Sequence, residues 1–173
     1  MYTQTELVLF FSKGGKSMIT LAEGSLSIFS NKLSIGLSLE DTKRLFAQWI
    51  KGISVFHSAT NPGGACVTFV ETTLLDIPVN INAFYADNTI YKIAIRINGN
   101  FMEGHSKLRG IRAYQENLKF AATQFNEKLA ENMRVQNRGD GTYVAYRENA
   151  FELFSSFDRD YLEYTVFLER AKE

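Results

Sequence analysis

The 173-residue sequence is poor in residues that most often carry chemistry, with one cysteine, two histidines and two prolines. Because Cys66 is the single cysteine, an internal disulfide is excluded and the fold depends on its apolar core. Nineteen basic residues balance nineteen acidic ones, and this zero net charge is not typical of a nucleic-acid-binding protein. The composition, 45% hydrophobic, is that of a globular protein and excludes a disordered chain.

Long apolar runs are also missing from the sequence. The longest one near the start covers the five residues 7–11. A signal peptide needs a longer apolar stretch, and a membrane helix needs about twenty apolar residues. We therefore expect no membrane span. The lone thiol favours the reducing cytoplasm, with the periplasm as the alternative if a signal peptide has been removed.

Alternating apolar and polar residues predict antiparallel strands in three parts of the chain. In the clearest part, Asp87 and Asn88 form the turn between two strands, and the second strand directs Lys92 and Arg96 away from a face made by Tyr91 and isoleucines. A loop is predicted over 53–64, which contains Asn-Pro-Gly-Gly. The predicted strands are 7–12, 17–22, 25–29, 67–74, 78–85, 89–98, 142–147, 150–157 and 161–169.

Two helices are predicted, over 39–51 and 111–134. Ser38 and Asp41 have capping-box spacing at the start of the first helix, and Gly52 stands where a left-handed cap is favoured. The second helix carries a continuous apolar stripe. The order is hairpins, helix, three strands, helix, three strands. It predicts one α+β domain with about six to nine antiparallel strands, in which 38–98 and 106–169 form a possible pseudo-repeat.

None of the motifs that usually mark an active site is complete. Gly15-Lys16-Ser17 lacks the earlier glycine of a phosphate loop and precedes a predicted strand, so it is interpreted as a turn. The histidines and the cysteine do not have metal-ligand spacing. Asp158 and Asp160 flank an arginine in a predicted turn, where solvated carboxylates are common. We therefore predict a protein that is not an enzyme and has neither cofactor nor metal site.

Aromatic residues and uneven charge indicate a binding surface. Twenty-three aromatics exceed what the predicted core needs. Residues 103–147 hold eight basic and five acidic side chains, whereas residues 148–173 hold three basic and seven acidic ones. An acidic, aromatic-rich final hairpin suits a basic partner, although a solvated sheet face would have the same composition. The aromatics expected outside the core are Phe56, Phe101, Phe154, Tyr161 and Phe167.

Residues 35–41, Ile-Gly-Leu-Ser-Leu-Glu-Asp, resemble the opening of many small bacterial α+β modules. Such modules include outer-membrane-assembly lipoprotein-like domains, the β-lactamase-inhibitor-like fold and immunity proteins that neutralise bacterial toxins. The chain lacks the lipidated cysteine of the first group and the paired cysteines of the second. The resemblance, which covers about 34–97, implies a binding module rather than an enzyme. Further segments that resemble these modules are 75–79, 84–85, 87–88 and 90–93.

The leading hypothesis is a bacterial immunity protein that binds a cognate toxin and blocks it by steric plugging. The expected form is a monomer or a small homo-oligomer. The predicted partner-binding residues are Phe154, Asp158, Arg159, Asp160 and Tyr161, with His57 and Asn61 on a facing loop.

Two other hypotheses stay open. One is a small-ligand-binding or enzymatic α+β barrel with a pocket between helices and sheet. The other is a structural role in an envelope or phage assembly, which requires a closed symmetric oligomer. The residues proposed to line the pocket are Tyr85, Tyr91, Tyr143, Glu71 and Arg96.

Overall fold

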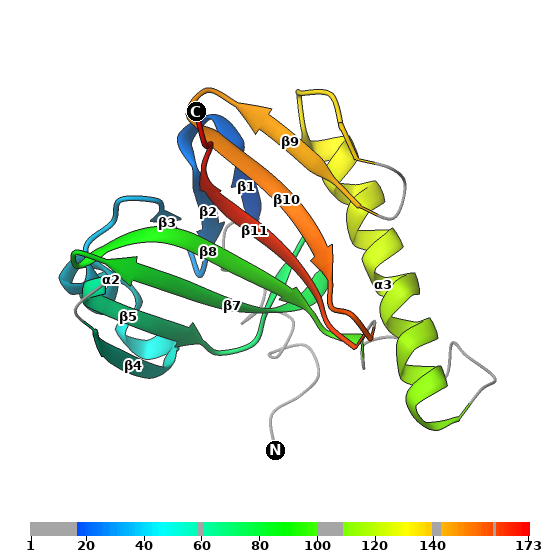
Figure 1. The fold of residues 1–173 in the computed structure, drawn as a ribbon, viewed down its shortest axis with the longest axis horizontal. Coiled ribbons are helices and arrows are strands. Elements are labelled where there is room, and N and C mark those ends of the chain that lie inside the picture. Colours follow the sequence, from blue (N-terminus) through cyan, green and yellow to red (C-terminus); the bar gives the residue numbers. More distant parts are fainter. Residues whose placement is uncertain (1–16, 59–60, 100–108, 140–142, 161) are drawn as a thin grey trace, which may run out of the picture.

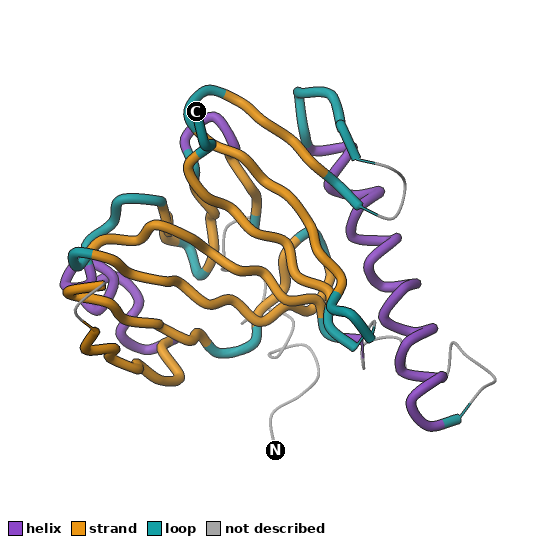
Figure 2. The backbone as a smooth tube through the Cα atoms, in the orientation of Figure 1, coloured by secondary structure: helices purple, strands orange, loops and turns teal. Residues whose placement is uncertain are grey.

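The computed structural model describes residues 17–58, 61–99, 109–139, 143–160 and 162–173. Within these residues the fold is α+β, as predicted, with two α-helices, a three-stranded sheet and an eight-stranded antiparallel sheet. Figures 1 and 2 show the strands of the larger sheet side by side, with α3 beside its C-terminal strands. The α-helices are α2 (Leu39–Phe46) and α3 (Gly110–Asn132), and the 3-10 helices are η1 (Leu21–Glu23) and η2 (Ala47–Trp49).

The larger sheet has the order β4-β5-β7-β8-β11-β10-β9, and β6 pairs with β7 beside this path. In this order β8 and β11, the last strands of the two predicted repeat units, are neighbours. The small sheet contains β1 (Met18–Thr20), β2 (Ser25–Ile28) and β3 (Asn31–Ser34). The larger sheet contains β4 (Ile50–Ser58), β5 (Asn61–Phe69), β6 (Thr72–Leu74), β7 (Ile77–Ala86), β8 (Thr89–Ile97), β9 (Ala145–Glu148), β10 (Phe151–Phe157) and β11 (Tyr164–Arg170).

One face of the larger sheet, called the inner face below, forms the hydrophobic core. Alternate residues of β7 and β11 are buried there, as expected for strands with one covered face. The buried stripe of α3 packs into the same core cluster, and α2 contributes Phe46, whose ring meets Phe69 of β5 edge to face. The stripe of α3 consists of Leu118, Ala121, Ala122, Phe125 and Leu129.

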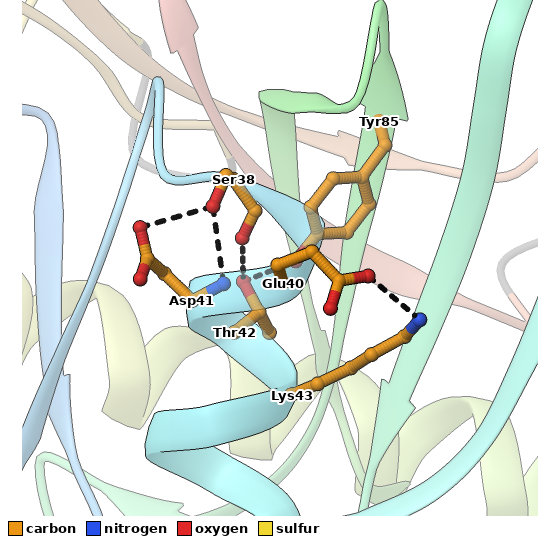
Figure 3. Close-up of polar contacts among 6 residues, drawn as sticks. All are labelled: Ser38, Glu40, Asp41, Thr42, Lys43 and Tyr85. Atoms are coloured by element: carbon orange, nitrogen blue, oxygen red, sulfur yellow. Dashed lines mark hydrogen bonds and ion pairs between the residues drawn. The ribbon is translucent and has the colours of Figure 1, made fainter.

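The start of α2 is built as the capping residues predict. The Ser38 hydroxyl accepts a hydrogen bond from the Asp41 amide at 3.0 Å, and Thr42 bonds back to the Ser38 carbonyl at 2.9 Å. Figure 3 shows that the Thr42 hydroxyl also receives a hydrogen bond from Tyr85 of β7, at 2.6 Å. This buried contact ties α2 to the inner face of the sheet.

Turn chemistry explains the hairpins. Asp87 and Asn88 have φ values of 50° and 62°, so the predicted turn between β7 and β8 is confirmed. Two consecutive residues with positive φ are typical of the tight turn whose twist matches antiparallel strands. Gly24, also at positive φ, faces β10 so closely that an added Cβ would lie 2.5 Å from the Phe151 ring. Glycine at this position therefore allows the small sheet to approach β10.

Three sequence predictions need correction. The helix expected over 39–51 ends at Phe46, and η2 leads into β4, so Gly52 is a strand residue rather than a cap. The loop expected over 53–64 is wrong, because β4 and β5 form a long hairpin there. The strand expected over 67–74 is divided between β5 and β6. Sheet pairing overrides local turn signals in this region.

The strand predicted over 17–22 ends at Thr20, before η1 begins, and the other predicted elements are present with small changes in their bounds. The second helix and the last three strands are confirmed as α3, β9, β10 and β11. The strand predicted over 7–12 lies outside the described residues. In the described part of the chain, no helix is long and apolar enough to span a membrane.

Candidate functional site

The opposite, outer face of the larger sheet carries a group of aromatic side chains around one lysine. In register, Phe84 of β7 lies opposite Lys92 of β8, and Phe167 of β11 lies opposite Phe154 of β10. The Lys92 ammonium is 5.8 Å from the centre of the Phe84 ring and 5.4 Å from that of Phe167. The Phe154 and Phe167 ring centres are 5.4 Å apart. We call Phe84, Lys92, Phe167 and Phe154 the aromatic strip.

The aromatic strip is separate from the hydrophobic core. Its three phenylalanines are half-buried, and none of them belongs to the core cluster or packs against it. Phe154 and Phe167 contact each other, and the Lys92 ammonium lies over Phe84 and Phe167, a cation–π arrangement worth about 0.5–1 kcal/mol at an exposed site. Four neighbouring strands therefore present an aromatic surface that the described part of the core does not require.

Charges of both signs flank the aromatic strip. Glu169 lies opposite Lys92 in the register, and Glu152 lies opposite Arg147. Arg96 of β8 forms an ion pair of 2.9 Å with Glu163, which precedes β11. The acidic character that the sequence indicates for the final hairpin is therefore partly neutralised by basic residues from neighbouring strands.

The structure places the predicted partner-binding residues in separate regions. Phe154 belongs to the aromatic strip, and Asp158, Arg159 and Asp160 lie exposed in the connection between β10 and β11. Asp158 accepts a hydrogen bond from the Leu162 amide at 2.6 Å, so its carboxylate shapes the turn. The Asp160 carbonyl accepts one from the Gln115 side chain of α3. Tyr161 lies outside the described residues.

His57 and Asn61 belong to strands that do not lie beside this turn, so the expectation that they are on a facing loop is wrong. Both belong to the β4–β5 hairpin, whose tip lies beside the β7–β8 turn, because the Asn88 amide bonds the Gly63 carbonyl. The β10–β11 connection lies at the other end of β8, next to Arg96. Since β8 has nine residues, these two ends are about 30 Å apart. The side chains of these two residues are outside the described part.

Sequence reasoning missed Phe84 and misplaced Tyr91. The alternation along β7 places Ala83 and Tyr85 on one side and therefore Phe84 on the other side, with Lys92. The sequence pattern could thus have identified Phe84 as an outer-face residue. Tyr91 was expected on the buried face. A bulge that pairs Tyr85 with Ile90 and Phe84 with Lys92 leaves Tyr91 exposed instead.

The residues proposed for a ligand pocket do not converge. Tyr85 is buried on the inner face against Thr42, and burial raises its pKa to about 12. Arg96 lies on the outer face with Glu163, Glu71 bonds Asn98, and the exposed Tyr143 meets the ring of Phe157. These contacts lie on different faces and strands. They therefore do not support a pocket built from this set.

Few of the described residues offer reactive chemistry. Cys66 lies on the outer side of β5 opposite Phe84, and burial raises the pKa of its thiol, which disfavours the nucleophilic thiolate. No cluster of three or more potential metal ligands occurs within the described ranges. Comparison of the chain with protein-family models, curated proteins and solved structures finds no match.

Proposed function

We propose that this protein is a non-enzymatic protein-binding module that contacts its partner through the outer face of the larger sheet. The aromatic strip is the observation that supports the proposal. Phe154 and Phe167 pack on each other and Lys92 lies over Phe167 and Phe84, so the rings are held in place, and a few aromatic anchors of this kind can carry much of the energy of protein–protein binding. The four strands that carry them are hydrogen-bonded neighbours, so little conformational entropy is lost on binding.

The rim of the aromatic strip indicates the chemistry of the partner. Lys92 lies over the rings of Phe84, Tyr91 and Phe167, and in the register it is opposite Glu169, so it suits a partner carboxylate placed beside an apolar side chain. Arg147, Glu152 and Glu169 around it carry charges of both signs. Such a rim would orient the partner, and it would not favour a strongly basic partner. In its most concrete form, the module is an immunity protein that sterically blocks a cognate toxin, as the resemblance to such proteins suggests.

The test compares a variant of the aromatic strip with a matched control. Phe154 and Phe167 are replaced by serine together, and Ile111→Ser on α3 serves as the control because Ile111 is exposed and lies outside the strip. The partner is captured from native cells, identified, purified and titrated against each variant. We expect about a 100-fold or greater loss of affinity for the double variant and none for the control. Unchanged affinity of the double variant would contradict the proposal.

A second variant separates the aromatic strip from the turn predicted at first. Alanine replaces Asp158, Arg159 and Asp160 together, which leaves the aromatic strip intact. If the turn were the contact surface, this variant would lose affinity and the strip variant would not. The hypothesis of an immunity protein has its own test. Cells that die when they express the identified partner alone must survive when they also express this protein.

A further inference from the structure

A second surface, the outer edge of β4, lies at one end of the larger sheet, where the described residues place no further strand. β4 is the terminal strand in the sheet order and pairs only with β5 among the described residues (Figure 1). Its side chains Ile53, Val55 and Phe56 are 39%, 57% and 48% exposed, although all three are large and apolar. An open, apolar edge strand exposes unpaired amides and carbonyls to any other strand.

The register divides β4 into a regular run between two irregular points. Pairing with β5 shifts between Ile50 and Gly52 and again between Phe56 and Ser58, and the five residues 52–56 between these shifts pair without interruption. These five residues are Gly-Ile-Ser-Val-Phe, which include neither a charge nor a proline. Nothing in this run therefore blocks the addition of another strand.

We propose that two copies of this chain associate through antiparallel pairing of their β4 strands, centred on Ser54. In this register Ser54 lies opposite Ser54 of the second copy, and Ile53 lies opposite Val55. Both apolar residues share the face of Val67 and Ala65, so the two inner faces continue into each other across the junction. The contact is self-complementary, as a two-fold symmetric interface requires.

The outer side of the junction is also complementary. Phe56 of one copy lies opposite Gly52 of the other, and this pair occurs twice by symmetry. An added Cβ at Gly52 would meet nothing within 4 Å in the single chain, so the space above this glycine is open to a ring. Within the β4–β5 hairpin Phe56 already lies opposite a glycine, Gly64. Covering an edge glycine with a cross-strand aromatic is a known stabilising device in sheets.

Charge favours the antiparallel pairing over the parallel one. Lys51 is the single charged residue of β4. Parallel pairing would set the two lysines side by side, whereas antiparallel pairing about Ser54 separates them by six residues, or about 20 Å. Like charges directly opposite each other destabilise a strand pair.

The first test measures the association of the full chain by sedimentation velocity over a range of concentrations. We expect a dimer that Val55→Lys weakens about tenfold or more, while Ile111→Lys, at an exposed position of α3, leaves it unchanged. Gly52→Val should weaken the dimer without affecting the single chain. The single chain has room for the added side chain, and only Phe56 of the second copy would be displaced. Circular dichroism and unfolding by urea are used to check that each variant is folded.

The second test fixes the register. Ser54→Cys is made together with Cys66→Ser, because Ser54 and Cys66 are cross-strand neighbours and would otherwise react with each other. A short bismaleimide should link two copies at position 54, but not at Ser156→Cys, an exposed outer-face position in the same background. A monomer at every concentration, or equal linking at both positions, would overturn the proposal. Either result would overturn the proposal even if another segment or another protein covers β4. The variant with Phe154 and Phe167 replaced by serine should still form the dimer, because the aromatic strip is not part of this contact.

Discussion

The two edges of the larger sheet are treated differently. At one edge, β9 has four residues, includes Arg147 and Glu148, and is closed by the segment before it. The Arg138 amide bonds the Ala145 carbonyl at 2.9 Å, and the Asn137 side chain accepts from the Ala145 amide at 3.1 Å. At the other edge, β4 has nine residues and exposes three large apolar side chains.

Among the described residues, this difference separates a protected edge from an unprotected one. Short, charged and capped edges are the usual protection against pairing with another chain, and β9 has all three features. β4 has none of them between Gly52 and Phe56. A chain that closes one edge and leaves the other apolar has a preferred direction for extending its sheet.

The largest expected effect concerns a feature that the two halves share. In the half of the sheet that ends at β4, the Tyr85 hydroxyl of β7 donates a hydrogen bond to Thr42 of α2. In the half that ends at β9, the Tyr164 hydroxyl of β11 donates one to the Asn126 side chain of α3, at 2.5 Å. Burial raises the pKa of each tyrosine to about 12, from an ordinary value of 10. Below pH 10 both states keep these protons. Between pH 10 and 12 the unfolded chain releases them while the folded chain does not, so stability falls as pH rises.

The alkaline loss should be roughly 3 kcal/mol for each tyrosine, measured as the free energy of unfolding in urea between pH 9 and 12. Tyr85→Phe and Tyr164→Phe should each remove roughly 3 kcal/mol of the loss, since each variant lacks one of the two hydroxyls. If the two variants reduce the alkaline loss of stability equally, the two halves of the sheet differ in their edges and not in how firmly their helices are anchored. A pH dependence unchanged in both variants would contradict this account.

The next effect compares two valines on the same face of neighbouring strands. Val67 of β5 is fully buried, whereas Val55 of β4 is mostly exposed. Val67→Ala should lower the free energy of unfolding by about 2–3 kcal/mol through lost burial and a cavity. Val55→Ala should cost less than about 1 kcal/mol. Urea denaturation at low protein concentration measures both, because association would otherwise add to the stability of the folded chain. Similar costs would mean that β4 is covered.

The smallest effect opens the closed edge. The Asn137 side chain accepts hydrogen bonds from the Gly139 amide at 2.9 Å and from the Ala145 amide at 3.1 Å. Asn137→Ala should cost about 1–2 kcal/mol, since two part-buried amides lose their acceptor. Hydrogen exchange should become faster at Ala145, and Asn137→Asp, which keeps an acceptor, is the control. Slow exchange at Ala145 in the alanine variant would show that Asn137 does not close the edge.

Much of the fold could be predicted, because its signals are local. The spacing of apolar residues along α3, the cap at Ser38 and the Asp87–Asn88 turn each depend on residues close in sequence. The candidate site was less predictable. Phe154 was expected on an exposed face, but the other members of the aromatic strip come from β7, β8 and β11, and strand order cannot be inferred from alternation alone.

The sequence by itself determined the α+β class, the second helix, most strands and the excess of aromatic residues over the needs of a core. Tertiary structure decided that 53–64 belongs to a hairpin and that Phe84, Lys92, Phe167 and Phe154 meet on one face. It also decided that β9 is capped, whereas β4 has no strand neighbour other than β5 among the described residues. The physical reason is that propensity and capping act over a few residues, whereas strand pairing joins residues far apart in the chain.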